Sequence, residues 1–259
     1  MSAPGVVESF VKLGGESIRV WEKGAGEALG VFAGLGGLNA WTPFLDELAK
    51  RRRVVVPSLP GFPGGGQLHR QLDNLADWVA CTLDLLEAAG LDGAELVGHS
   101  IGGTLAAEAG AFSRASVKKL TLIAPFGLFD ESEPVADVWA RRVNEIPALF
   151  SAKPAEFAKE RLTPPAGLSP EAATEWAIVQ NRATEAAARL LWPVGELGLA
   201  KRLHRISCPV KLVWGAEDRV VPPSYAKKFA SGLAGPTETR VVPGAGHALD
   251  FDAPGTAIG

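Results

Sequence analysis

Ser100 lies at the centre of the segment ELVGHSIGGT, residues 95–104, two positions after Gly98 and two positions before Gly102. The apolar run before it predicts a strand that ends near Val97, and the residues after it predict a helix that begins near Ile101. Such a join needs a very tight reversal. Glycines there remove the Cβ atoms that would collide, and they leave the serine hydroxyl exposed at the carboxyl end of the sheet. A helix N-cap would also explain a serine at this point, so the segment alone leaves both interpretations open.

A serine hydroxyl is a useful nucleophile only when a base accepts its proton and an acid orients that base. Asp218 follows the apolar run VKLVW in the segment WGAEDRVVP, and His247 follows the next apolar run in the segment VPGAGHALDF. The carboxyl ends of parallel strands gather at one edge of a sheet. We therefore expect Ser100, Asp218 and His247 to meet there as nucleophile, acid and base.

Other side chains could fill the same roles. Three further histidines are alternative bases, but none stands in a loop just after a late strand: His69, His99 and His204. Asp250 and Asp252 are alternative acids, although they lie too near His247 in the sequence to approach it easily from the correct side. The scattered histidines offer no metal-ligand spacing, so we predict no metal and no other cofactor.

The surrounding pattern predicts an α/β fold, with a mostly parallel sheet of about eight strands and helices on both faces. Residues 10–24, FVKLGGESIRVWEKG, indicate an opening hairpin that turns at Gly14 and Gly15. The later strands are expected in ALGVFAG, RRVVVPSL, AELVGH, KKLTLIAP, PVKLVWG and TETRVVPG. Helices are expected in AWTPFLDELAKR, LDNLADWVACTLDLLEAAG, GGTLAAEAGAF and SYAKKFASGL.

Residues 126–205 interrupt this alternation. They contain helical segments between proline and glycine clusters such as TPPAGLSP, and no convincing strand. We interpret them as a helical cap inserted into a core of residues 1–125 and 206–259. A long irregular loop is the alternative, but structureless loops beyond roughly 15 residues are uncommon in compact domains.

Composition excludes several classes of function. The chain has 259 residues, of which 47% are hydrophobic and 21% charged, as in ordinary globular proteins. Its net charge of -3 provides no basic surface for nucleic acid. Cys81 and Cys208 are too few for a disulfide framework, and we predict buried, reduced thiols. The N-terminus has no signal-peptide pattern, and no apolar run reaches membrane-spanning length. We expect a cytoplasmic monomer or homodimer without a membrane partner.

Four segments together resemble the motifs of the α/β-hydrolase fold family: GHSIG, GAEDRVVP, GAGHALDFDAP and SLPGF (residues 58–62). They span nearly the whole chain in the right order. The resemblance implies a serine hydrolase with a helical cap, a Ser-Asp-His triad and no cofactor. It also implies an oxyanion hole formed by the backbone N–H groups of Ile101 and Leu35.

The sequence departs from the family pattern in two places. Ala33 and Gly34 replace the common His-Gly pair. Because that histidine usually braces the loop, its absence bears on the rigidity of the loop more than on the reaction. The family also adds a helix after the segment that corresponds to DFDAP, whereas this sequence ends at Gly259. Either the terminus is trimmed or another chain covers the exposed face.

The substrate is expected to be a small or medium, largely apolar carboxylic ester, cleaved through an acyl-enzyme intermediate. Serine at the elbow argues against epoxide hydrolases and haloalkane dehalogenases, which carry aspartate there. The candidate residues of the substrate pocket are Gly34, Phe126, Trp139, Trp176 and Trp192, with Leu190 and Leu191 as further apolar candidates. The ordinary role of such cap side chains is to pack the cap on the core.

Three alternatives remain at this stage. A carbon-carbon bond hydrolase of a vinylogous diketone would need basic cap residues for a substrate carboxylate, and the candidates are Arg141, Arg142 and Arg189. A thioesterase would need room for a long carrier arm. A ligand receptor could retain the triad with little turnover.

Overall fold

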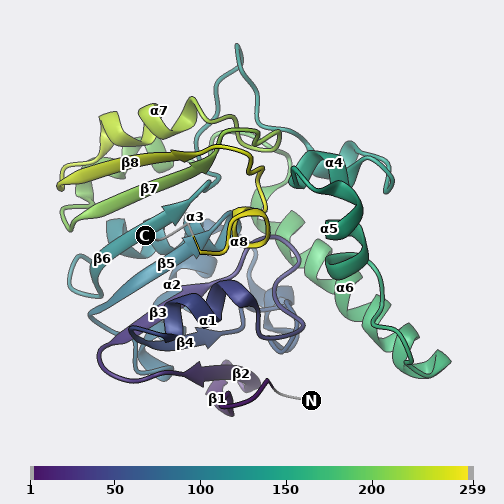
Figure 1. The fold of residues 1–259 in the computed structure, drawn as a ribbon. Coiled ribbons are helices and arrows are strands. Elements are labelled where there is room, and N and C mark those ends of the chain that lie inside the picture. Colours follow the sequence, from purple (N-terminus) through teal and green to yellow (C-terminus); the bar gives the residue numbers. More distant parts are fainter. Residues whose placement is uncertain (1–2, 256–259) are drawn as a thin grey trace.

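An eight-stranded sheet forms the centre of the protein, whose computed structural model describes residues 3–255 (Figure 1). The strand order is β1-β2-β4-β3-β5-β6-β7-β8. The strands are β1 Val7–Leu13, β2 Glu16–Lys23, β3 Ala28–Phe32, β4 Arg53–Pro57, β5 Ala94–His99, β6 Val117–Ile123, β7 Val210–Gly215 and β8 Thr237–Val242.

The first strands pair in opposite directions and the others run in parallel. Leu13 pairs with Glu16 across the turn, where Gly14 and Gly15 have φ angles of 54° and 83°. Positive φ at both turn positions is the geometry that a two-residue hairpin requires, and glycine adopts it without strain. β2 then pairs antiparallel with β4, and every later pairing is parallel. The hairpin and the mostly parallel sheet predicted from the sequence are both present.

Helices cover the two faces of the sheet (Figure 1). In β4, Val55 packs into one buried apolar cluster, whereas Val54 and Val56 pack into the other, because successive strand residues point to opposite faces. The cluster around Val55 lies under α2 and α3, and the second lies under α1 and α8. The helices of the core are α1 Pro43–Ala49, α2 Leu75–Ala88, α3 Ile101–Phe112, α7 Tyr225–Gly232 and α8 Leu249–Asp252, with a 3₁₀ turn at Leu68–Gln71.

The segment between β6 and β7 is helical in the structure. It contains α4 Ile146–Phe150, α5 Pro154–Arg161, α6 Pro170–Leu191 and 3₁₀ turns at Val138–Ala140, Leu199–Lys201 and Leu203–Arg205. Ser169 caps α6 by accepting a hydrogen bond from the N–H of Ala172 at 3.2 Å, and Pro170 occupies the first helical position. The second half of α6 buries small residues against the core, whereas its first half extends away from the sheet (Figure 1).

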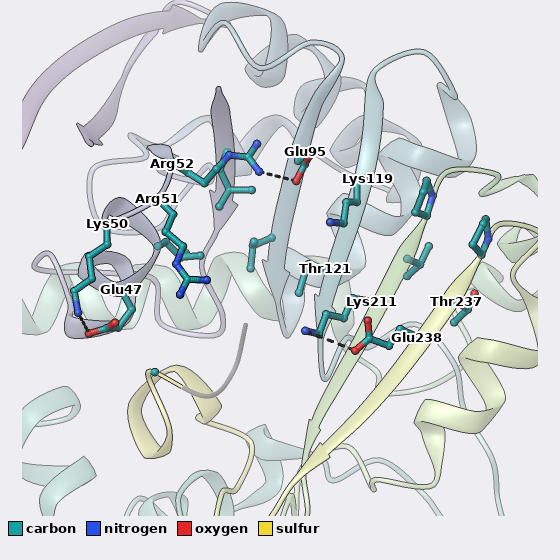
Figure 2. A pocket seen from close by; sticks show the side chains of 17 residues that line it. Glu47, Lys50, Arg51, Arg52, Glu95, Lys119, Thr121, Lys211, Thr237 and Glu238 are labelled. Carbon is teal, nitrogen blue, oxygen red and sulfur yellow. Dashed lines mark hydrogen bonds and ion pairs between the residues drawn. The ribbon is translucent and has the colours of Figure 1, made fainter. Parts of the chain in front are cut away.

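Part of the sheet beside α1 is open, and a groove of about 650 Å³ crosses it (Figure 2). The lining of the groove contains charged side chains of both signs. Two ion pairs lie in it, Arg52 with Glu95 at 2.9 Å and Lys211 with Glu238 at 3.8 Å. Gly255 lines this groove. The prediction made for the end of the sequence concerns residues 256–259, which lie outside the described residues.

Both cysteines are free thiols. Cys81 lies on the buried face of α2, where burial raises its pKa to about 12. Cys208 is only partly buried, so the prediction that both thiols are buried is wrong for this one. The reason is its position in the loop before β7, at the end of the sheet, where fewer elements cover the chain. Among the described helices, none combines the length and hydropathy needed to cross a membrane.

Candidate active site

The segment around Ser100 forms the tight reversal that its glycines predict. Ser100 joins β5 to α3 with φ 55° and ψ -122°, a conformation that residues with a Cβ rarely adopt. A Cβ at Gly98 would lie 2.6 Å from the carbonyl oxygen of Gly102, and a Cβ at Gly102 would lie 2.5 Å from that of Ala33. The side chain of Ser100 makes no capping hydrogen bond to α3. The geometry therefore favours a strained nucleophile turn over a helix N-cap.

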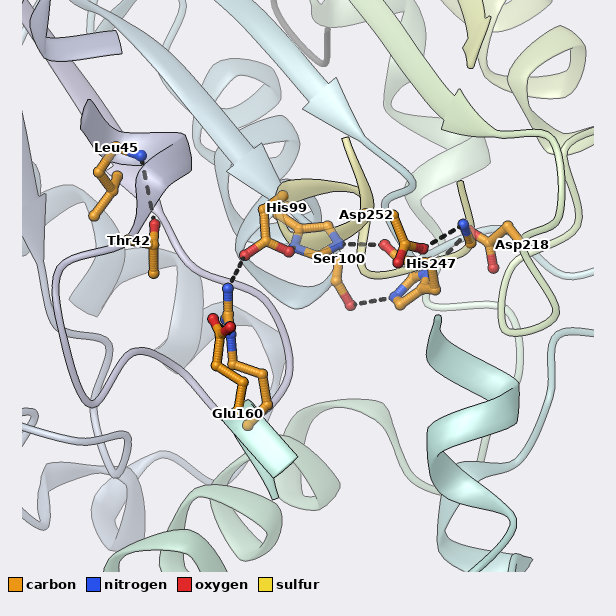
Figure 3. A network of polar contacts seen from close by, with 11 residues as sticks. Thr42, Leu45, His99, Ser100, Glu160, Asp218, His247 and Asp252 are labelled. Carbon is orange, nitrogen blue, oxygen red and sulfur yellow. Dashed lines mark hydrogen bonds and ion pairs between the residues drawn. The ribbon is translucent and has the colours of Figure 1, made fainter. Parts of the chain in front are cut away.

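Ser100, His247 and Asp218 form one hydrogen-bonded chain (Figure 3). The Ser100 hydroxyl donates to His247 Nε2 at 2.8 Å, and His247 Nδ1–H donates to Asp218 Oδ2 at 2.9 Å. Asp218 Oδ1 accepts from the backbone N–H groups of Val220 and Val221 at 2.8 and 2.9 Å. These bonds fix the carboxylate, which in turn orients the imidazole. The arrangement is suited to moving a proton between the serine and the histidine.

The strand ends bring these residues together. Asp218 lies in the turn after β7 and His247 in the loop after β8. A Cβ at Gly215, the last residue of β7, would lie 2.3 Å from the carbonyl oxygens of Ala245 and Gly246. The missing side chain thus lets the two loops touch, and the triad is buried at their junction, with Ser100 and His247 without exposed area.

The alternative bases do not contact the serine in the described part of the chain. His99 Nε2–H donates to the carbonyl oxygen of His247 at 2.7 Å, and burial lowers the pKa of His99. His69 is buried with Nε2 3.8 Å from Glu185 of α6, and His204 lies in a 3₁₀ turn of the insertion. His99 therefore supports the histidine loop, and His247 is the histidine that is hydrogen-bonded to Ser100.

The alternative acids also bind elsewhere. Asp250 lies 3.0 Å from Arg161 and 3.5 Å from His99 Nδ1. Burial raises the pKa of Asp250, but the charges of Arg161 and His99 and the hydrogen bonds to the carboxylate together outweigh burial, so the pKa is lowered overall. Asp252 accepts hydrogen bonds from Gly246 and Ser151. Neither carboxylate reaches the imidazole of His247, in agreement with the sequence argument.

Ile101 and Leu35 are the residues whose backbone N–H groups are predicted to form an oxyanion hole. Ile101 is the first residue of α3, and the first N–H groups of a helix have no acceptor within it. Leu35 belongs to the loop after β3 and lines a pocket beside His247. A Cβ at Gly34 would lie 2.8 Å from His99 Nδ1, so this loop packs closely on the elbow.

Arg19 supports the loop after β3. Its guanidinium lies 3.6 Å from the ring centroid of Trp21 on the same strand, β2, and donates to the carbonyl oxygens of Leu38 and Pro63, both at 2.8 Å. Burial lowers the pKa of Arg19 to about 10. The side chain thus joins the loop after β3 to the loop after β4. Sequence reasoning missed it, although an arginine within the apolar run SIRVW was a visible signal.

The pocket has a volume of about 240 Å³. Of the residues predicted for substrate binding, Gly34 and Trp176 line it, and so does Leu35. The remaining lining includes side chains from the insertion that the sequence analysis did not single out: Phe150, Phe157, Glu160, Arg161 and Leu162. The ring of Phe150 meets that of His247 edge-on, with centroids 5.4 Å apart.

The other predicted pocket residues lie elsewhere. Phe126 packs edge-on against His247, with ring centroids 5.7 Å apart, without lining the pocket. Trp139 donates to the carbonyl oxygen of Thr184 at 3.4 Å, and Trp192 is 58% exposed at the end of α6. Leu190 and Leu191 are buried in the core. The last turns of α6 lie against the core and away from the pocket, whereas Trp176 and Gln180, earlier in the helix, line it.

A model of the alpha/beta hydrolase family matches residues 31–258. The chain belongs to this family. The α/β-hydrolase fold predicted from the motifs is thus confirmed, and the chain is an alpha/beta hydrolase.

The proteins that this chain resembles carry different names. One relative is the dihydrolipoyllysine-residue acetyltransferase component of the acetoin cleaving system of Pseudomonas putida. The two sequences are 28% identical over an alignment of 267 residues, which covers 97% of this chain and 67% of the relative. This chain is 30% identical over 135 residues, 50% of its length and 49% of the relative's, to a 2-hydroxy-6-oxo-2,4-heptadienoate hydrolase of the same species. Among solved structures, a meta-cleavage product hydrolase of Pseudomonas fluorescens superimposes with a TM-score of 0.74 at 19% identity, covering 94% of this chain and 92% of that one.

Proposed function

We propose that this alpha/beta hydrolase cleaves a small or medium, largely apolar carboxylic ester through an acyl-enzyme intermediate. The observation that carries the proposal is the continuous hydrogen-bonded chain from the Ser100 hydroxyl through His247 to Asp218, with distances of 2.8 and 2.9 Å.

In the proposed mechanism, Ser100 Oγ attacks the acyl carbon while His247 Nε2 takes its proton. Asp218 stabilises the imidazolium that forms. The N–H groups of Ile101 and Leu35 bind the developing oxyanion, and such donors are worth about 3 kcal/mol each. His247 then returns the proton to the leaving alcohol. A water molecule, activated by the same imidazole, releases the acid and restores the serine.

The charges of the pocket support an uncharged ester over a substrate with a carboxylate. Among the described lining residues, Arg161 supplies the one guanidinium, and it lies 3.0 Å from Asp250 and 3.5 Å from Glu160. The basic residues considered from the sequence are not in the lining. Arg141 and Arg142 are exposed, and Arg189 donates to the carbonyl oxygens of His69 and Arg70.

The pocket volume also favours a compact substrate. About 240 Å³ leaves no room for a long carrier arm in this conformation. Because Ser100 and His247 have no exposed area, we infer that the insertion acts as a cap that moves to admit substrate. A vinylogous diketone remains the second candidate, because the 2-hydroxy-6-oxo-2,4-heptadienoate hydrolase is among the relatives.

The test compares the wild type with Ser100→Ala on p-nitrophenyl acetate and butyrate, a matched thioester and a vinylogous diketone. We expect ester hydrolysis by the wild type and none above background by the variant, with an unchanged circular dichroism spectrum. A fluorophosphonate probe should label the wild type alone. Undiminished hydrolysis by the variant would rule out Ser100, and faster turnover of the diketone than of the esters would replace the ester proposal.

A further inference from the structure

The residues before and after His247 each donate a backbone hydrogen bond, one directly to the insertion and one to a carboxylate that contacts it. The N–H of Ala248 donates to the carbonyl oxygen of Phe150, at the end of α4, at 2.7 Å. The N–H of Gly246 donates to Asp252 Oδ2, also at 2.7 Å. The histidine is therefore fixed between two hydrogen bonds, of which one goes directly to the insertion and the other goes to a carboxylate of α8.

That carboxylate is itself bound to the insertion. Asp252 Oδ1 accepts from the Ser151 hydroxyl at 2.5 Å, and Oδ2 accepts from the N–H of Ala152 at 3.0 Å. The Lys153 ammonium donates to the backbone carbonyl oxygen of Asp252 at 3.1 Å. Asp252 thus connects the histidine loop to the insertion. We term the contacted segment, which runs from the last residue of α4 to the residue before α5, the cap junction (residues 150–153).

The contact between the cap junction and the histidine loop leaves little slack. A Cβ at Gly246 would lie 2.8 Å from the carbonyl oxygen of Phe150, so only glycine permits this approach. Asp252 and Ser151 are 7% and 4% exposed. A carboxylate with so little contact with water depends on its protein donors, because water cannot replace a lost one. Displacement of the cap junction would therefore leave Asp252 unsatisfied and Gly246 unanchored.

We propose that Asp252 is a positioning residue for His247, through which the docked cap junction sets the distance from the imidazole to Ser100. The proposal rests on the serine hydrolase function above. Asp252 does not touch the reacting atoms, and it acts by holding the backbone immediately before the base. Removing it should thus affect the chemical step more than substrate binding.

The experiment measures steady-state hydrolysis of p-nitrophenyl butyrate and the rate of fluorophosphonate labelling. It compares the wild type with Asp252→Ala, Asp252→Asn and a control variant. For Asp252→Ala we expect kcat and the labelling rate to fall about 100-fold, the loss that a displacement of about 1 Å can cause, with KM changed less than about threefold. Asp252→Asn should recover most of the kcat. Its carboxamide oxygen can accept from Gly246 and Ala152 while its amide donates to Ser151. In proton NMR, the downfield resonance of the His247 Nδ1–H should broaden in Asp252→Ala and persist in Asp252→Asn.

The matched control is Glu108→Ala. Glu108 is also a buried carboxylate, bound by Arg202 at 2.6 and 2.8 Å, but it lies on α3 away from the histidine loop. This variant should lose stability and retain the kcat and the His247 resonance. If Asp252→Ala does not fold, Ser151→Ala removes one donor to the same carboxylate and should lower kcat by a smaller factor.

The outcomes separate the two proposals. A wild type that neither hydrolyses the ester nor reacts with the probe would overturn the hydrolase function and the positioning role with it. A reactive wild type with an equally reactive Asp252→Ala, or Ser151→Ala where that variant stands in, would overturn the positioning role alone. So would an equal fall of kcat in Glu108→Ala, or a rise of KM at constant kcat.

Discussion

The Asp218 carboxylate has distinct partners on its two oxygens. Oδ1 is held by two backbone N–H groups and Oδ2 faces His247 Nδ1. The backbone bonds fix the orientation of the carboxylate, so that Oδ2 always accepts from the imidazole. The tautomer with its proton on Nδ1 is therefore favoured, and it leaves Nε2 free to accept from Ser100.

Asp218→Asn should lower kcat by about 10⁴, as expected when the acid of a triad becomes an amide and the imidazole adopts the wrong tautomer. With its oxygen held by Val220 and Val221, the carboxamide would present its NH₂ group to Nδ1. Rates of p-nitrophenyl butyrate hydrolysis, with thermal unfolding as the control for folding, test this expectation. An unchanged kcat would transfer the role of the acid to another residue.

At the same scale, the sequence predicted the hydrogen-bonded chain of Ser100, His247 and Asp218 better than the residues around it. Ser100, Asp218 and His247 each follow a strand and carry local glycine or acidic motifs, so short segments were enough to find them. Asp252 contacts Ser151 across 101 positions and Arg19 contacts Pro63 across 44. No local pattern encodes such pairings, and the pocket residues Phe150 and Arg161 escaped for the same reason.

Among the elements, the turn from β5 into α3 places a strict demand on the sequence. Gly102 faces the backbone of β3 and the loop after it, where the carbonyl oxygens of Phe32 and Ala33 leave no space for a Cβ. Gly110, two turns later in the same helix, would bring a Cβ only to 3.3 Å from a methyl group of Leu120. One helix thus contains a glycine that the packing requires and another that it does not.

Gly102→Ala is expected to destabilise the protein by several kcal/mol, on the order of 3 kcal/mol, because backbone atoms must shift. Gly110→Ala should change stability by less than about 1 kcal/mol in either direction, since the gain in helix propensity offsets a small adjustment of Leu120. Urea denaturation of both variants measures the difference. Equal effects would show that the close approach at Gly102 is not what the turn requires.

Most regular elements followed from periodicity because they bury an apolar face, as β4, β7 and α2 do. The placement of the insertion over the core could not be predicted from periodicity. Its helices were predicted, but Trp139 and Trp192 were expected in the pocket and lie outside its lining. Helical spacing tells which residues share a face of α6. It does not tell which part of a 22-residue helix lies over the site and which lies over the core.

For the whole molecule, two buried histidines couple stability to pH. Burial is the first cause that lowers the pKa of His69 and of His99 below the ordinary value of 6.5. Below that value the unfolded chain binds protons that the folded protein does not, so the free energy of unfolding falls as the pH falls. The contribution of the two neutral histidines to the free energy of unfolding is fully present above about pH 6.5. It is lost as the pH falls toward the lower pKa that these histidines have in the folded state.

Urea unfolding at about pH 7.5 and about pH 5.5 should therefore show lower stability at the acidic value. His69→Phe should reduce this difference, because it removes one titrating group. Phenylalanine has a similar shape, and neither ring nitrogen of His69 has a hydrogen-bond partner. The two nitrogens thus lose no bond in the variant. An unchanged difference between the two pH values would exclude His69 as a contributor.

The order of the triad along the chain has a consequence for synthesis. Ser100 precedes the insertion and His247 comes after it, 147 positions after Ser100. At translation rates of about 5–20 residues per second, the ribosome exposes the hydroxyl on the order of ten seconds before its proton acceptor exists. Under the proposed mechanism, a nascent polypeptide therefore carries an unreactive serine until β8 and the loop that contains His247 have joined the fold.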